Sequence, residues 1–252
     1  MPMTTQQALV KVPAVTLGFW LIKVLATTLG ETGGDAVSMS MNLGYLVSSA
    51  IFLMVFVAAV YWQIRAAEFQ ATRYWIAIIA STTVGTTIAD FCTRSLGIGY
   101  AGGSALLLTL LAVSILAWYF TLGRVDVGSV NTPSAETFYW VTIMMSQTLG
   151  TALGDWVADT EGLGYLAAAE IFGGLMLLLL ALYKFTAVSR TLLFWAAFVL
   201  TRPLGAVVGD WLDKPIANGG LDLSRYGASI TLISAIVVLL VLLPQRAAVR
   251  AH

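Results

Sequence analysis

Residues 20–35 read WLIKVLATTLGETGGD, and the same skeleton occurs three more times along the 252-residue chain. Each copy has a tryptophan fifteen residues before an aspartate, a glycine five residues before that aspartate, and glycine or alanine immediately before it. Four copies of one pattern indicate four structural repeats. The tryptophan–aspartate pairs are Trp20 and Asp35, Trp75 and Asp90, Trp140 and Asp155, and Trp195 and Asp210.

The composition is typical of a membrane protein with several spans. Hydrophobic residues make up 59% of the chain, charged residues make up 10%, and the mean hydropathy is +0.87. A helix needs about 20 mostly apolar residues to cross a bilayer, so we expect an all-α polytopic membrane protein with eight spanning helices. The expected spans are residues 14–34, 43–64, 74–92, 99–122, 137–158, 163–185, 191–212 and 226–244.

Two expected spans make up each repeat. We interpret a repeat as a helical hairpin, in which the first helix carries the motif and a short outer loop leads to the second. Two helices return the chain to the same side, so the four repeats are parallel and can form a pseudo-fourfold bundle or two pseudo-twofold halves. Residues 1–252 form one transmembrane domain, with repeats at approximately 12–66, 67–122, 132–187 and 188–246.

Lysine and arginine are unevenly distributed between the two sides of the expected bundle. The termini and the loops between repeats hold eight of them, whereas the loops inside repeats hold only Arg94, Lys214 and Arg225. By the positive-inside rule, both termini face the cytoplasm. The repeat aspartates then lie toward the outer ends of their helices.

The first repeat resembles a known family. Residues 11–16 (KVPAVT), followed by Phe19-Trp20, Lys23, Thr27-Thr28 and the segment from Gly30 to Asp35, are similar to the first repeat of a bacterial family of uncharacterised membrane-anchored proteins. That family is defined by a four-copy repeat of unknown function. The resemblance covers nearly the whole chain and implies the repeat architecture and a bacterial inner membrane, but no activity.

The glycines and tryptophans of the motif have structural interpretations. The two small residues before each aspartate are four apart, a spacing that lets helix backbones approach closely in lipid. We therefore expect the motif-bearing helices at the centre of the bundle. Fifteen residues of helix rise about 22 Å, which places each tryptophan near the inner interface, where an aromatic belt is the expected role.

The aspartates lie on a polar stripe. A carboxylate at a helix carboxyl end meets the negative end of the helix dipole, so four such acids suggest a function, the alternative being helix-ending acids exposed to water. Steps of four residues back from each aspartate stay on one helical face, and polar groups inside a membrane tend to line cavities or ion pathways. The candidate binding residues are Asp35, Asp90, Asp155, Asp210, Glu31, Thr27, Thr82, Thr86, Gln147 and Thr151.

Three further charged residues are candidates for coupling or charge compensation. Arg202 is expected to be an internal counter-ion to the acids, with the binding of an anionic substrate as the alternative. Lys23 extends the polar stripe of the first repeat. Glu170 is expected to cap the polar path or to pair with Lys23 or Arg202, the alternative being a position that reaches solvent near the outer surface. The acids outnumber Lys23 and Arg202, so we expect the cluster to attract cations.

These residues favour a transporter that moves a small cation. Carboxylate and hydroxyl oxygens suit divalent metals such as Mn²⁺, Mg²⁺ or Ca²⁺, and protons would compete with the metal at crowded carboxylates. The expected substrate is thus a divalent metal such as Mn²⁺, exchanged for protons, with no tightly bound cofactor. The expected metal ligands are Asp35, Asp90, Asp155, Asp210 and Glu31.

Other functions remain as alternatives. Four parallel repeats could form a cation channel with a ring of four aspartates, or the protein could be an assembly factor or sensor that transports nothing. An enzyme is not expected, because no nucleophile–base pair is visible and the single histidine, His252, is the last residue. Nucleic-acid binding lacks a basic patch. The expected partners are the lipid bilayer, the cation and protons, and the sequence leaves homo-oligomer formation open.

Overall fold

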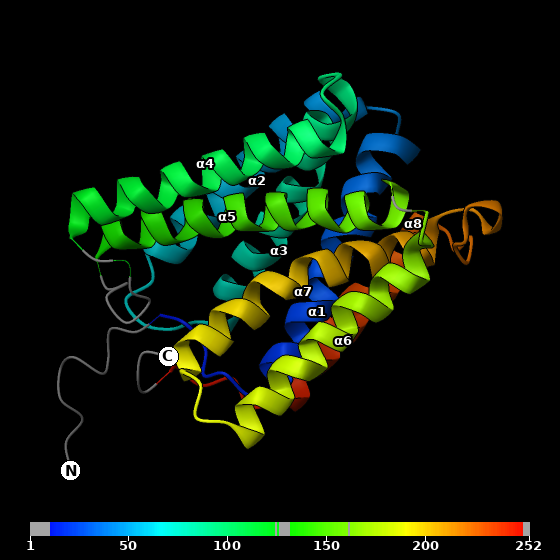
Figure 1. Ribbon diagram of the computed structural model, residues 1–252. Helices are drawn as coiled ribbons and strands as arrows, with labels where there is room; N and C mark the ends of the chain where they lie inside the picture. Colours follow the sequence, from blue (N-terminus) through cyan, green and yellow to red (C-terminus); the bar gives the residue numbers. More distant parts are fainter. Residues whose placement is uncertain (1–10, 124, 126–131, 161, 249–252) are drawn as a thin grey trace, which may run out of the picture.

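The computed structural model describes residues 11–123, 125, 132–160 and 162–248, and within them it is helical (Figure 1). Each of the eight expected apolar segments contains an α-helix. The helices are α1 (Leu17–Asp35), α2 (Gly44–Ile64), α3 (Ala71–Asp90), α4 (Gly99–Leu122), α5 (Pro133–Asp155), α6 (Gly164–Phe185), α7 (Arg190–Asp213) and α8 (Arg225–Leu242).

Three of the four odd-numbered helices begin with local capping signals, and α3 begins without a side-chain cap. Thr16, Thr132 and Ser189 precede α1, α5 and α7, and each side-chain oxygen accepts a hydrogen bond from the backbone N–H three residues later. Pro133 follows Thr132 in the first turn of α5, where its missing N–H costs nothing. These caps fix the start of the helices that carry the repeat motif.

The carboxyl ends of the first three odd helices continue into π-helical turns. These turns are η2 (Ala36–Ser40), η3 (Phe91–Ser95) and η5 (Trp156–Thr160), and each begins directly after a repeat aspartate. The helices α2, α4 and α6 then start at a glycine with positive φ, between 65° and 78° at Gly44, Gly99 and Gly164. Only glycine adopts this conformation readily, which explains why a glycine recurs at this position in the first three repeats.

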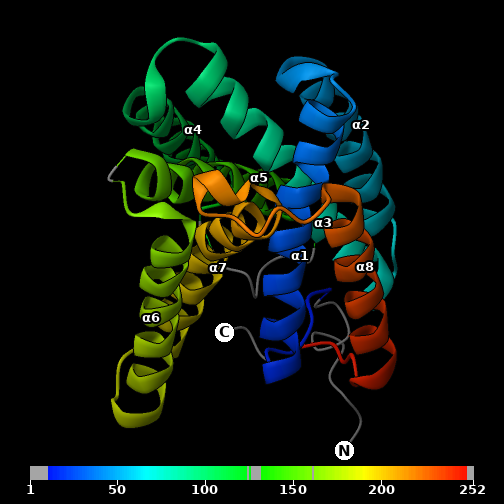
Figure 2. The ribbon, with the colours of Figure 1, turned by 90° about the vertical axis from the view of Figure 1, so that its right-hand side faces the viewer.

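The four odd helices pack in a closed cycle. α1 contacts α3, α3 contacts α5, α5 contacts α7, and α7 returns to α1. Around this cycle each even helix lies on the odd helix of the following repeat: α2 on α3, α4 on α5, α6 on α7, and α8 on α1. Figure 2 shows α8 along one side of α1, with α6 beside α7. The odd helices therefore form the centre, as expected.

The hairpin interpretation of one repeat was wrong. Along their lengths, the two helices of a repeat have few or no contacts with each other in the described residues, and α2, α4 and α6 meet their own repeat mainly at the turn that follows its aspartate. The turn carries the chain across to the neighbouring odd helix. Each even helix consequently buries its inner face only because the next repeat is present.

The motif glycines make the close approaches of this cycle. A Cβ added to each would touch the same position of the next repeat, eight residues before its aspartate. Equivalent contacts on every side require that the odd helices run in the same direction. The pairs are Gly30 with Thr82, Gly85 with Gln147, Gly150 with Arg202, and Gly205 with Thr27.

Within the described residues, six helices are long and apolar enough to cross a membrane: α2, α3, α4, α6, α7 and α8. The chain is thus a multi-pass membrane protein. α1 and α5 fall outside this group, and both are rich in polar residues that are buried inside the bundle.

We predict that Gly30→Ala destabilises the protein whereas Gly33→Ala does not. A Cβ at Gly30 collides with Thr82, but a Cβ at Gly33 meets no atom within 4 Å. Overpacking costs about 1–3 kcal/mol, while an unhindered helical Gly→Ala change gains up to about 1 kcal/mol. Thermal unfolding in detergent should show a lower Tm for Gly30→Ala only. Equal Tm values for the two variants would contradict the close approach.

Candidate functional site

Four buried carboxylates gather at the carboxyl ends of the odd helices. Asp35, Asp90, Asp155 and Asp210 are each at most 1% exposed. The acids are held in two pairs, Asp90 with Asp155 and Asp35 with Asp210, and a basic side chain joins the members of each pair. The sequence left open whether the four acids share one site, and the arrangement is two pairs.

Arg94 holds the first pair. Its Nε lies 3.1 Å from an oxygen of Asp90, and its Nη2 lies 3.0 Å from Asp155 and 3.8 Å from Asp159. Arg94 belongs to the turn η3, four residues after Asp90. Through its planar guanidinium group the second repeat is tied to the third.

Lys214 holds the second pair. Its Nζ lies 2.8 Å from Asp35 and 2.9 Å from Asp210, so it ties the fourth repeat to the first. Burial alone would lower the pKa of this ammonium group, but the carboxylates of Asp210 and Asp35 raise the pKa of Lys214 above its ordinary value, and the group stays protonated.

Three acids lie close enough together to hold a metal ion. One carboxylate oxygen from each of Glu31, Asp35 and Asp210 lies within 4.8 Å of the others.

Both basic residues were missed as site residues. The sequence placed Arg94 and Lys214 in outer loops, although a signal was available at the position four residues after each aspartate. That position is one helical turn beyond the acid, and it is basic in the second and fourth repeats only: Met39, Arg94, Asp159 and Lys214. With these two cations present, the acid excess on which cation attraction was predicted is smaller than expected.

Several of the acid oxygens are buried without a hydrogen-bond partner among the described residues. They include both oxygens of Asp90, both of Asp210, and Oδ1 of Asp35 and of Asp155. The basic groups lie at ion-pair distance from some of these atoms without hydrogen-bond geometry. A buried polar atom that lacks a partner is uncommon in proteins and calls for an explanation. The oxygens that are not the atoms in these ion pairs can accept a proton or ligate a cation: Asp90 Oδ2, Asp210 Oδ2, Asp35 Oδ1 and Asp155 Oδ1.

An ion pair lies one to two helical turns deeper. Arg202 of α7 is fully buried, and its Nη2 lies 3.0 Å from Glu31 Oε2 and donates to the Thr86 hydroxyl at 2.6 Å. Its Nη1 donates to the backbone carbonyl of Thr27 at 3.3 Å. Arg202 therefore lies opposite an acid of the first repeat, as a counter-ion does.

The predicted hydroxyl ligands are mostly engaged by backbone. Thr27 donates to Thr201 O at 3.0 Å, Thr82 to Ala26 O at 3.2 Å, and Thr86 to Gly30 O at 3.0 Å, each across a helix–helix contact. Thr151 donates to the carbonyl of Gln147 within its own helix at 3.4 Å. These bonds join or stiffen the central helices.

Two amide or amine groups in the core lack such a partner. Gln147 is 1% exposed, and its Nε2 makes no hydrogen bond within the described part of the chain. Lys23 is fully buried, and its Nζ likewise has no acceptor there but lies 4.3 Å from the centre of the Phe198 ring. The layer around Lys23 is apolar, because Ile78 and Ile143 occupy the equivalent positions of α3 and α5.

Aromatic side chains close the core at the amino-terminal ends of the odd helices, opposite the aspartates. Trp75 and Trp140 are at most 2% exposed, so for these two the aromatic-belt interpretation was wrong. The Phe19 and Trp75 ring centres are 5.5 Å apart, and those of Tyr74 and Trp140 are 5.7 Å apart. Each odd helix supplies two adjacent aromatic residues to this layer: Phe19 and Trp20, Tyr74 and Trp75, Tyr139 and Trp140, and Phe194 and Trp195.

Segments near the two ends of the chain cross beneath the aromatic layer. Pro13 and Ala247 form an antiparallel bridge, with hydrogen bonds from Ala14 N to Arg246 O at 2.8 Å and from Ala248 N to Val12 O at 2.9 Å. In addition, Lys11 lies 2.7 Å from Glu136 at the start of α5. We call residues 11–15 and 245–248 the inner strap.

Glu170 does not join the polar core. Its side chain is exposed on α6, and the ion pairs of the described residues do not include it. The residues of α6 that face the bundle are Tyr165, Ala168 and Phe172, and Glu170 lies on the opposite side of the helix. Pairing with Lys23 or Arg202 was therefore a wrong prediction.

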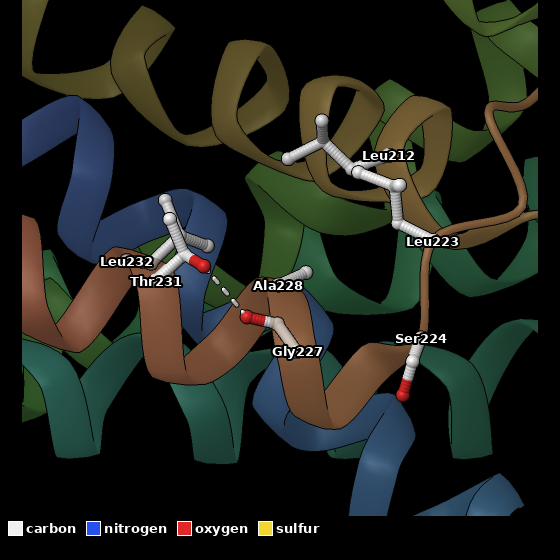
Figure 3. Close-up of a pocket in the computed structure, with 7 residues that line it drawn as sticks. All are labelled: Leu212, Leu223, Ser224, Gly227, Ala228, Thr231 and Leu232. Carbon is white, nitrogen blue, oxygen red and sulfur yellow. Dashed lines mark hydrogen bonds between the residues drawn. The ribbon is translucent and has the colours of Figure 1, made fainter.

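A pocket of about 290 Å³ lies apart from the acids, between the end of α7 and α8 (Figure 3). Leu212, Leu223 and Leu232 contribute most of its apolar lining. Its one hydroxyl on α8, Thr231, donates to the carbonyl of Gly227 at 2.9 Å. This pocket offers no charged group to a cation.

Comparison with known families gives the same division of the chain into four. The family described as Repeat of Unknown Function (DUF347) matches residues 18–69, 73–123, 138–189 and 193–245. No curated protein and no solved structure matches the chain. Each match includes one odd helix with its aspartate and the even helix that follows, which confirms the resemblance seen in the first repeat. The chain therefore belongs to the family of the Repeat of Unknown Function (DUF347).

Proposed function

We propose that the protein is a carrier that moves a small divalent cation, such as Mn²⁺, in exchange for protons. The supporting observation is the set of buried carboxylate oxygens that have no hydrogen-bond partner among the described residues, at the converging ends of four helices. Keeping such oxygens out of water is costly. A cation or a proton that binds them reversibly would remove the cost in the bound state.

In this proposal all eight helices span a bacterial inner membrane, with both termini in the cytoplasm. α1 and α5 are more polar than a lipid-exposed span, but they lie inside the cycle, where protein covers their polar faces. A span of this kind does not have to be apolar all round. The acid layer then faces the outer side, and the inner strap faces the cytoplasm.

Asp35 and Asp210 of the acid layer, together with Glu31 one helical turn before Asp35, form the proposed metal site. Its three carboxylate oxygens lie within 4.8 Å of one another, so small side-chain movements would bring them around one ion. Oxygen ligands of this kind suit Mn²⁺, Mg²⁺ and Ca²⁺. When the metal leaves, protons would take its place on the same oxygens, which couples the two fluxes.

Two observations favour a carrier over a channel with a four-aspartate ring. The aspartates are divided into two pairs, each joined by a basic side chain, instead of lining an open ring. The aromatic layer and the inner strap also cover the cytoplasmic end of the core. A carrier alternates between such closed ends, whereas a pore needs a continuous path.

We predict that Asp35→Asn and Asp210→Asn each lower Mn²⁺ flux into proteoliposomes by at least about tenfold, because each removes a charged ligand. The matched control is Asp222→Asn. Asp222 is exposed in the α7–α8 loop with a φ of 56°, a conformation that asparagine also tolerates. Internal pH recorded with the metal flux tests for proton exchange.

The outcomes of this assay separate the alternatives. Metal flux that moves protons and is lost in the two aspartate variants supports the exchanger. Flux without saturation or proton movement supports the channel. Absence of flux for every divalent metal tested, with folded wild-type protein, would contradict transport and favour an assembly or sensing role.

We also predict that joining the inner strap blocks transport. Pro13 and Ala247 form the non-hydrogen-bonded pair of their bridge, and such pairs bring Cα atoms to about 4.5 Å, within disulfide range. In a Cys92→Ser background, which removes the single native cysteine, the Pro13→Cys, Ala247→Cys variant should lose flux on oxidation and regain it on reduction.

The corresponding single-cysteine variants are the controls, and they should show no response to oxidant. Full flux through the cross-linked protein would exclude movement of the strap from the transport cycle. That result would not contradict the proposed metal site.

A further inference from the structure

We propose that the Lys214 ammonium group is a tethered cation, which occupies the metal site while the site is empty and is displaced when a divalent ion binds. The inference rests on the proposed function. It also assigns different roles to the two basic residues of the acid layer, since Arg94 holds its acid pair permanently.

The first argument is the position of the charge. Lys214 Nζ lies between one oxygen of Asp35 and one of Asp210, at 2.8 and 2.9 Å. These residues supply two of the three oxygens that could surround a metal. An ion bound there would lie within a few ångströms of the ammonium group, and two cations at that distance repel strongly in a buried site. Their occupancies are therefore mutually exclusive.

The second argument is the freedom of the side chain. The Lys214 backbone is held, because its N–H donates to Asp210 O and its carbonyl accepts from Asp222 N, both at 2.9 Å. The charge, however, is at the end of a flexible stem of four carbons. Lys214 follows the last residue of α7, and its side chain is 10% exposed, so the charged end has a route toward solvent.

A place for the displaced ammonium group lies nearby. Asp213, the preceding residue, pairs with Arg225 through Oδ2 at 2.9 Å, while its Oδ1 has no hydrogen-bond partner among the described side chains. The charge of Lys214 can therefore stay close to a carboxylate after it leaves Asp35 and Asp210. This lowers the cost of displacement relative to an isolated buried charge.

Arg94 differs from Lys214 in the number and geometry of its contacts. Two of its nitrogen atoms contact two different acids, and a third acid lies 3.8 Å away. Its planar, branched group cannot be replaced at those contacts by a spherical ion as a single ammonium nitrogen can. Arg94 also lies within the continuous helical segment Ala71–Ser95. The pair of Asp90 and Asp155 is thus permanently compensated, and exchange takes place at the other pair.

The first test measures Mn²⁺ binding to purified protein by calorimetry. Lys214→Met keeps a long apolar side chain but removes the competitor, so we expect binding at least about tenfold tighter than in wild type. Lys214→Arg should bind Mn²⁺ more weakly than wild type. Lys184→Met is the matched control, because it makes the same substitution at an exposed residue near the end of α6, away from the acids. Its affinity should change by less than about threefold.

The second test needs no substitution. Amine acylation of wild-type protein, mapped by mass spectrometry, should label Lys214 several-fold faster with saturating Mn²⁺ than without metal. Lys184 is exposed on α6 and serves as the internal control with an unchanged rate. Labelling of Lys214 that is insensitive to bound Mn²⁺ would overturn the proposal, as would a Lys214→Met variant that binds no more tightly than wild type.

These results are distinguishable from failure of the proposed function. If wild type transports Mn²⁺ but Lys214→Met binds Mn²⁺ with unchanged affinity, the role proposed for Lys214 is excluded and the proposed transport function is not. Absence of Mn²⁺ binding in wild type and in every variant excludes both. If Lys214→Met binds Mn²⁺ but wild type does not, Lys214 occupies the site without being displaced, which overturns the proposed replacement of its ammonium group by the metal.

Discussion

The arrangement of the molecule depends on the contact between a motif glycine and the polar position of the next repeat. Gly30, Gly85, Gly150 and Gly205 have no side chain, so the neighbouring helix can bring Thr82, Gln147, Arg202 or Thr27 against the backbone. Without a hydrophobic driving force between helices in lipid, such close packing and the hydrogen bonds it permits are the main sources of association. The same contacts place the polar stripe of every helix inside the cycle. Packing and the polar core therefore have one cause.

The backbone arrangement repeats four times, but a basic residue follows the motif aspartate in only two of the four repeats. Arg94 and Lys214 follow the aspartates of the second and fourth repeats and join them to the third and first. The corresponding positions, Met39 and Asp159, carry no positive charge. One to two helical turns below the aspartates the repeats differ further, because Arg202 of α7 and Glu31 of α1 form an ion pair at one of the four contacts between odd helices. A symmetric scaffold thus holds an asymmetric site, which suits a carrier with distinct binding and compensating groups better than a uniform ring.

The sequence was sufficient for the features that depend on local spacing. Helix positions, the central place of the motif helices and the burial of the polar stripe all follow from apolar length and from steps of four residues. It was insufficient for features set by the path of the chain between helices. The helices α2, α4 and α6 cross to the following repeat through π-helical turns, which no hydropathy pattern encodes, so the hairpin interpretation was wrong. Trp75 and Trp140 were assigned to lipid interfaces because an indole near a helix end is ambiguous until its neighbours are known. Arg94 and Lys214 were read as loop charges, since hydropathy assigns basic residues to water.

The buried charges are poor candidates for structural reinforcement. Removing two charges from water costs several kcal/mol per ion, and a buried pair regains this only with excellent geometry and satisfied remaining atoms. Here the geometry is incomplete: Arg202 Nε, both oxygens of Asp210 and the Lys23 amine lack hydrogen-bond partners in the described part of the chain. Apolar side chains would stabilise the same helices at lower cost, as Ile78 and Ile143 do around Lys23. Charges that weaken the fold in this way are best explained by a reaction in which their partners change. Asp35 and Asp210 are joined by a single ammonium nitrogen at the end of a flexible side chain, so a change of partner requires the least rearrangement at this pair.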